Sequence, residues 1–158
     1  AKMCGPFMWE SGYTTYVRHA IASDDQLDVV AKHDGYLDDM RVVHRRHFSW
    51  HPMLRKWVLR DELVGNGDYT IELLFHVHPA CSVTQESYTV FHIHGRGFRV
   101  ELVLSNHLSS RIAEGETDPP LGWYSRTLGV KEPCPVIVAK GRAIGSDNIF
   151  SEFSIAPQ

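Results

Sequence analysis

Turn-forming residues recur about every ten positions along this chain, and segments with β-strand character lie between them. Positions that contain Gly, Pro, Asn, Asp or Ser mark turns at 23–25, 51–54, 65–68, 95–97 and 118–120. No segment has the i, i+3, i+4, i+7 apolar spacing of an amphipathic helix. The chain is therefore predicted to be all-β: an antiparallel β-sandwich of roughly 10–12 strands with little or no helix.

The stretch from His33 to Glu62 has the clearest internal organisation. Residues 42–50 and 57–59 are predicted to be neighbouring strands joined by a turn at 51–54, and Asp34-Gly35 is predicted to form a turn before them. The expected strands are 14–22, 27–31, 42–50, 57–59, 69–77, 82–85, 88–94, 98–104, 123–128, 136–140 and 149–155.

Two glycine-containing turns are expected to close hairpins. Asn66-Gly67 is the strongest turn signal in the chain, because an Asn-Gly pair tolerates the positive φ of a tight hairpin. Residues 95–97 are expected to join 88–94 to 98–104, whose apolar side chains alternate with Arg99 and Glu101. With no linker or internal repeat, residues 1–158 are predicted to form a single domain.

Composition removes several classes of protein. The 158 residues are 43% hydrophobic and 22% charged, which is typical of a globular chain. A formal net charge of −3 gives no basic face for nucleic acid, and no apolar run approaches the roughly 18 residues of a membrane-spanning helix. Three scattered cysteines, Cys4, Cys81 and Cys134, do not make a disulfide framework. The start at Ala1, without a signal sequence, suits a piece of a longer protein.

Two His-x-His pairs stand out among the ten histidines: His76 with His78, and His92 with His94. Residues two apart on a strand share a face, so each pair could present two imidazoles to one metal ion, and four nitrogens could converge if the strands were neighbours. The competing interpretation is the polar, solvent-facing side of a half-buried sheet. Neither pair has a third ligand at a recognisable spacing, which favours the second interpretation.

A series of short motifs runs through nearly the whole chain in a fixed order. They are GPFMW (5–9), HDGY (33–36), HRR (44–46), WVLRDEL (57–63), YTIELLFHVHP (69–79), GWYS (122–125), KEPCP (131–135) and SIAP (154–157). Together they resemble the C-terminal β region of the heparinase II/III-like polysaccharide lyases. No single motif is very specific, and the resemblance rests on their order and spacing.

The resemblance implies a two-part parent enzyme, in which a helical toroid precedes layered antiparallel sheets. Such an enzyme cleaves a uronic-acid-containing polysaccharide by β-elimination: a base removes the proton next to the carboxylate, and the glycosidic oxygen leaves. The catalytic residues of the family lie in the toroid and in a His-x-His segment before the GPFMW position. No catalytic residue is therefore assigned to this chain.

The expected role is that of a C-terminal module that is inactive alone, packs against the toroid and forms one wall of the substrate cleft. Its compartment would be periplasmic or extracellular if the parent follows the family. The module itself is expected to require no cofactor. The resemblance also implies a structural zinc, held by the upstream His-x-His, an aspartate and a later histidine, for which His33 is the candidate.

Candidate residues for binding an anionic polysaccharide come from the cationic region between positions 41 and 60. Arg45 and Arg46 are predicted to contact carboxylate or sulfate groups, and Trp123 and Tyr124 to stack on sugar rings. The competing interpretation is that nearby acidic residues pair with the arginines and that the aromatic residues are core anchors. The adjacent Asp61 and Glu62 must face opposite sides of a strand, so they cannot act as a glycosidase pair.

Two other functions fit the same sequence. In one, the chain is a free-standing carbohydrate-binding module that uses its exposed aromatic residues. In the other, it is a β-sandwich enzyme that binds a metal ion through the residues His76, His78, His92 and His94. Cys81 and Cys134 have no activating neighbour in the sequence and are expected to be inert thiols.

Overall fold

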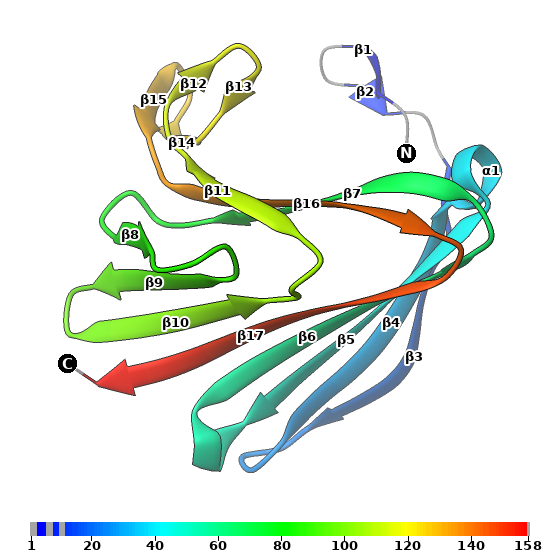
Figure 1. The fold of residues 1–158 in the computed structure, drawn as a ribbon, viewed down its shortest axis with the longest axis horizontal. Helices are drawn as coiled ribbons and strands as arrows, with labels where there is room; N and C mark the ends of the chain where they lie inside the picture. Colours follow the sequence, from blue (N-terminus) through cyan, green and yellow to red (C-terminus); the bar gives the residue numbers. More distant parts are fainter. Residues whose placement is uncertain (1–2, 6–7, 10–11, 158) are drawn as a thin grey trace.

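The computed structural model describes residues 3–5, 8–9 and 12–157, and these are mostly β-structure (Figure 1). Of the GPFMW motif, residues 6 and 7 lie outside the described part. Two short helical turns are present, α1 (Leu37–Met40) and the 3-10 turn η1 (Pro52–Leu54). No helix in the described ranges is long and apolar enough to cross a membrane.

One large antiparallel sheet forms the base of the fold. Its strands, in spatial order, are β3 (Thr15–Ala22), β4 (Leu27–Tyr36), β5 (Val42–His51), β6 (Lys56–Gly65), β17 (Asp147–Pro157), β10 (Phe98–Leu104), β9 (Val90–Gly95) and β8 (Ser82–Gln85). Figure 1 shows it as a strongly twisted, curved layer.

A smaller sheet packs against part of the inner face of this layer. It contains β11 (Ser109–Ala113), β16 (Val136–Ile144) and β7 (Asp68–His76), with β16 in the centre. Three hairpins complete the chain: β1 (Met3–Gly5) with β2 (Met8–Trp9), β12 (Glu116–Thr117) with β13 (Pro120–Leu121), and β14 (Trp123–Thr127) with β15 (Val130–Pro133).

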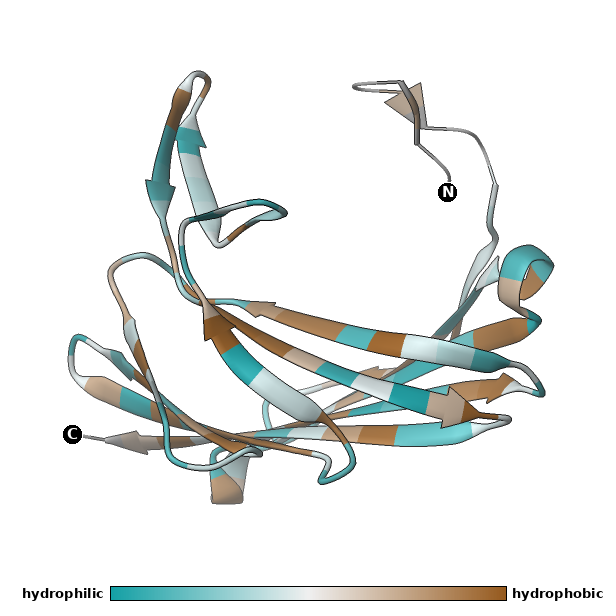
Figure 2. Ribbon diagram, turned by 45° about the horizontal axis from the view of Figure 1, so that its top comes forward, coloured by the Kyte–Doolittle hydropathy of each residue, from teal (hydrophilic) through white to brown (hydrophobic). Residues whose placement is uncertain are grey.

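The main core lies where the two sheets overlap. Phe91 and Leu102 of the large sheet are fully buried, and Ile137 of the small sheet packs into the same cluster. Hydrophobic and hydrophilic residues alternate along many of the strands, as period-2 burial requires (Figure 2). The two sheets therefore form the antiparallel sandwich that the sequence predicts.

A second, smaller core lies on the other face of the small sheet. Val136 and Val138 of β16 point there, and Leu121 and Tyr124 of the hairpins pack against them. Because both faces of β16 are covered at this end, residues 136–139 are all buried. This explains why the sequence reads there as a continuous apolar run instead of an alternating one.

Most predicted strands and turns are confirmed, with two corrections. The Asp34-Gly35 pair does not form a turn: β4 runs on to Tyr36, and the chain reverses in α1. Asn66-Gly67 does not close a hairpin, because β6 and β7 belong to different sheets and the turn carries the chain from one to the other. The described part also has more strands than predicted, because the short hairpins contribute strands of two to five residues.

Candidate functional site

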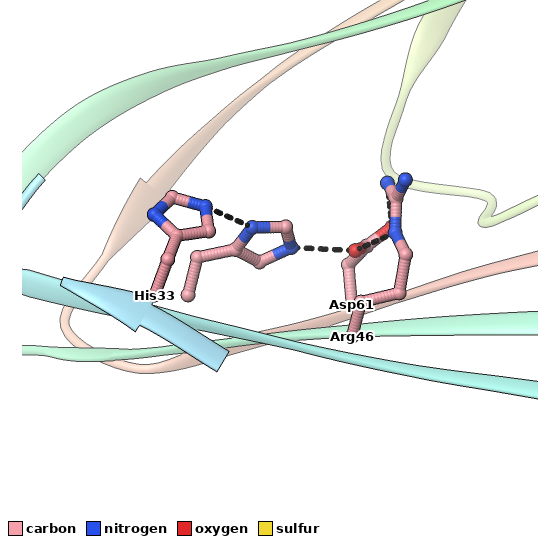
Figure 3. A network of polar contacts seen from close by, with 4 residues as sticks. His33, Arg46 and Asp61 are labelled. Atoms are coloured by element: carbon pink, nitrogen blue, oxygen red, sulfur yellow. Dashed lines mark hydrogen bonds and ion pairs between the residues drawn. The ribbon is translucent and has the colours of Figure 1, made fainter. Parts of the chain in front are cut away.

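The most connected group of polar side chains lies on the inner face of the large sheet. Strand register places it: His33 of β4 lies opposite His44 of β5, and Arg46 of β5 lies opposite Asp61 of β6. His44 and Arg46 are two residues apart on β5, so all four side chains share one face. We call these four residues the inner-face network (Figure 3).

The hydrogen bonds of the inner-face network form one continuous chain. The Gly35 N–H donates to His33 Nδ1 over 3.2 Å, so the neutral His33 ring carries its proton on Nε2. That Nε2–H donates to His44 Nδ1 over 2.9 Å, and the His44 Nε2–H donates to Asp61 Oδ1 over 2.6 Å. In this arrangement Nε2 is the donor nitrogen of both imidazoles and Nδ1 is the acceptor.

Arg46 closes the chain at its acidic end. Its Nε–H donates to Asp61 Oδ1 over 2.7 Å, and an Nη2–H donates to Asp61 Oδ2 over 2.9 Å. This bidentate pair compensates the charge of a carboxylate that is only 2% exposed. Burial alone would raise the pKa of Asp61, but the hydrogen bonds from His44 and Arg46 outweigh it and hold that pKa below its ordinary value.

The inner-face network borders a cavity of about 330 Å³ between the two sheets. His44, Arg46 and Asp61 line one side, and Tyr69 and Glu72 of β7 line the other. Arg46 uses two of its five N–H donors on Asp61, which leaves three for other acceptors. The network can therefore hold a guanidinium in a fixed orientation, while its histidines are committed to each other and to Asp61.

His33 makes the stability of the fold dependent on pH. Its pKa is lowered by burial and by the neighbouring His44 and Arg46, against the opposing effect of Asp34. A histidine whose pKa is lowered in the folded state stabilises the fold at pH values above its ordinary pKa of 6.5. That contribution is lost as the pH falls through the folded-state pKa.

The free energy of unfolding should therefore decrease as the pH falls below 6.5. His33→Gln should flatten this dependence of the free energy of unfolding on pH, as measured by urea titrations at a series of pH values. An unchanged slope in His33→Gln would contradict the assignment.

The described residues around His33 do not by themselves form a cluster of metal ligands. Both of its ring nitrogens already have hydrogen-bond partners, the Gly35 N–H and His44 Nδ1. Within the described ranges, no cluster of three or more His, Cys, Asp or Glu side chains is arranged to hold a metal ion. His33 could supply one ligand at most, so zinc binding through it stays a prediction that depends on ligands from elsewhere.

The two His-x-His pairs lie on or next to strands of different sheets. His76 is at the end of β7 in the small sheet, and His78 follows that strand with its ring 5.6 Å from the Tyr124 ring. His92 and His94 lie on β9 in the large sheet, on the face opposite to Phe91. The strands are not neighbours, so the condition for four converging nitrogens is not met. Metal binding by either pair alone stays a prediction.

Arg45 and Arg46 point to opposite faces of the large sheet. Arg45 lies opposite Glu62 on the outer face and forms an ion pair with it, while Arg46 pairs with Asp61 on the inner face. Arg60 also approaches Glu62, at 3.5 Å. The two predicted sugar-binding arginines therefore cannot contact one sugar ring together, and Asp61 and Glu62 face opposite sides as expected.

The two predicted stacking residues, Trp123 and Tyr124, both have contacts within the protein. The Trp123 Nε1–H donates to the Glu116 carbonyl over 2.7 Å, and Lys131 Nζ lies 3.9 Å from the centre of its ring. Tyr124 packs on the second core. These contacts match the anchoring interpretation, and sugar stacking stays untested.

The sequence reasoning missed the inner-face network as a unit. It singled out His33, Arg46 and Asp61 separately and did not assign His44. The sequence did contain a signal for it: pairing the facing ends of the two predicted strands, residue 50 with residue 57, places Arg46 opposite Asp61 in an antiparallel register. The next inward-facing pair in that register contains His44, which lies opposite Leu63.

Comparisons with known proteins agree with this architecture. A family model described as "Heparinase II/III-like, C-terminal" matches residues 1–152. The solved structure of the heparan sulfate lyase HepC from Pedobacter heparinus is similar, with a TM-score of 0.76 and 10% identity over 91% of this chain and 22% of that chain. A heparinase III structure gives a TM-score of 0.68 and 17% identity over 90% and 21%.

These structural matches show the fold alone, and this chain spans about a fifth of the length of these two structures. No curated protein matches the sequence. The family assignment rests on the model that covers nearly all of the sequence, and it agrees with the fold and with the motif order. The chain belongs to the heparinase II/III-like C-terminal domain family.

Proposed function

We propose that this chain is the C-terminal β-domain of a polysaccharide lyase that cleaves a uronic-acid-containing polysaccharide by β-elimination. In that enzyme the domain packs against a helical toroid and forms one wall of the substrate cleft. The match to the family over residues 1–152 is the observation that carries this proposal. The similarity to solved heparinase and heparan sulfate lyase structures supports it.

The chemistry of the inner-face network supports a module that is inactive alone. β-Elimination requires a base that is free to take the proton next to the carboxylate. In the inner-face network, His33 Nδ1 accepts from the Gly35 N–H, His44 Nδ1 accepts from His33, and Arg46 neutralises Asp61. Each basic atom of this network thus already has a hydrogen-bond donor, so the network does not supply the free base, and the proposal assigns the proton acceptor to the rest of the parent enzyme.

Binding of the anionic sugar is assigned to the arginines as part of the same proposal. Arg46 is the candidate on the inner face, because Asp61 orients it and leaves three N–H donors unused. Arg45 would act on the other face, where it shares Glu62 with Arg60. The contribution of each is expected to be modest, because both guanidinium groups are already paired.

The proposal predicts that the 158-residue chain gives no lyase turnover, whereas the longer protein that contains it does. Both are incubated with heparin, heparan sulfate and alginate, and the ultraviolet absorbance of the unsaturated uronate product is followed. A circular dichroism spectrum dominated by β-structure provides the folding control for the short chain. Robust turnover by the short chain would overturn the claim of inactivity, and absence of turnover in the longer protein on every uronate would overturn the lyase assignment.

A further inference from the structure

The two sheets of the sandwich differ greatly in width. The large sheet has eight strands and the small sheet three, so the small sheet covers only part of the inner face (Figure 1). Buried residues gather on β9, β10 and β17 under the small sheet, while every residue of β3 is exposed and those of β4 are mostly half-buried. An antiparallel sandwich normally buries the inner faces of both sheets along their length.

An apolar groove marks the boundary of the covered region. It has a volume of about 510 Å³ and runs between β7 and the strands β5, β6 and β17. Nine of its ten lining residues are apolar, and Arg46 is the exception. Stacked aromatic rings form its floor, with the centroids of Phe48 and Trp57 4.8 Å apart. Open apolar surface of this kind marks a place where another segment docks.

Strand β7 borders this groove and has a free edge. In the described part of the chain it pairs with β16 on one side and with no strand on the other. It is nine residues long, its inward side chains Tyr69, Ile71, Leu73 and Phe75 are apolar, and no proline interrupts it. A long edge strand with regular alternation is a template for further strand pairing, and proteins rarely leave one uncovered.

The geometry of the free edge and the groove fits the same occupant. Leu73 and Phe75 of β7 line the groove, so a strand paired with β7 would lie directly above Phe48 and Trp57. Strands in a sheet lie about 4.8 Å apart, and each added strand would extend the small sheet toward β4 and β3. Its alternate side chains would fill the groove while its backbone satisfied the N–H and C=O groups of β7.

We propose that the free edge of β7 and the apolar groove receive one or more β-strands from the polypeptide that precedes residue 1 in the parent enzyme. The inference rests on the proposed function, in which this chain is one part of a longer lyase. It is supported by the length of the matched structures, of which this chain spans 21–22%. The added strands would widen the small sheet and complete the sandwich. They would also cover Arg46, so Arg45 on the outer face would remain the arginine that is open to the sugar.

Hydrogen exchange in the longer protein tests this proposal directly. The backbone amides of β7 that point to its free edge should exchange at least about 100-fold more slowly in the longer protein than in the 158-residue chain. A strand paired with these amides must open locally before they can exchange. The fluorescence of Trp57 should also become less accessible to an added quencher. If these amides exchange freely and Trp57 stays accessible in the longer protein, the proposal is wrong, even if the short chain does not fold and no comparison is possible.

Matched variants separate the groove from the rest of the sheet. Leu59→Lys places a charge in the groove and should restore fast exchange of the β7 amides in the longer protein, whereas Val58→Lys, on the opposite face of β6, should leave their exchange slow.

Protection of the β7 amides that arises in the short chain only as its concentration rises would show that a second copy binds β7, and it would overturn the proposal. Lyase activity is measured separately, so slow exchange without turnover would contradict the proposed function and leave the strand docking intact.

Discussion

Asp61→Ala is expected to lower the free energy of unfolding by about 3 kcal/mol, because it removes the acceptor from a buried network. Asp61 accepts hydrogen bonds from His44 and from two nitrogens of Arg46, and it is 2% exposed. Without it, the His44 Nε2–H has no acceptor and little access to water, since that side chain is 16% exposed. The Arg46 side chain is 45% exposed and can turn to solvent. The decrease in the free energy of unfolding should therefore lie at the low end of the range for a broken buried ion pair.

The neighbouring acid provides the matched control for Asp61→Ala. Glu62 carries the same charge on the same strand but pairs with Arg45 on the outer face, so Glu62→Ala should cost about 1 kcal/mol or less. Urea unfolding followed by tryptophan fluorescence measures both variants. A loss of about 3 kcal/mol corresponds to a fall of about 6–12 °C in Tm for a domain of this size. Equal effects of the two substitutions would show that the inner-face network does not stabilise the fold.

Phe91→Ala should destabilise the protein by about 3–5 kcal/mol, which is the largest effect of any single substitution considered for this chain. Phe91 has no exposed surface, lies opposite Leu102 on β10, and packs into the core between the sheets. Truncating it removes the transfer free energy of an aromatic ring and leaves a cavity that the surrounding strands cannot fill without shifting. The variant chain should therefore unfold at a much lower urea concentration.

Phe150→Ala tests the same change at an exposed site. Phe150 lies on β17, is 44% exposed, and has the Arg60 guanidinium 5.7 Å from the centre of its ring. Its removal should cost about 1 kcal/mol, mainly through the lost cation–π contact and a small loss of buried area. If Phe150→Ala were as destabilising as Phe91→Ala, the burial pattern of the two sheets would be wrong.

The two corrections to the predicted turns share one physical reason. Asn66-Gly67 has the local chemistry of a hairpin turn, yet the chain leaves one sheet there and enters another, a choice made by packing across the core. Asp34-Gly35 likewise has turn chemistry, but its residues continue β4 because His33 is held opposite His44 by the sheet and by the inner-face network. Local turn propensity is a weak preference, and tertiary contacts overrule it.

Some features of this protein follow from its sequence alone. Period-2 alternation and regularly spaced turns determined that it is an antiparallel β-protein, and two strands, 82–85 and 98–104, match their predicted bounds. The motif order indicated the family. Strand alternation and turn chemistry can be read from the sequence because they depend on neighbours a few residues away, and motif order is a property of the sequence itself.

Only the tertiary structure decided which strands pair across long separations and which faces remain open. It placed His33, His44, Arg46 and Asp61 in one hydrogen-bonded chain, and it put His76 and His92 on separate sheets. Among the residues that the structure describes, it also left β7 with a free edge beside an apolar groove. Sheet order joins segments tens of residues apart, and it is fixed by the burial of both sheets together rather than by any local pattern.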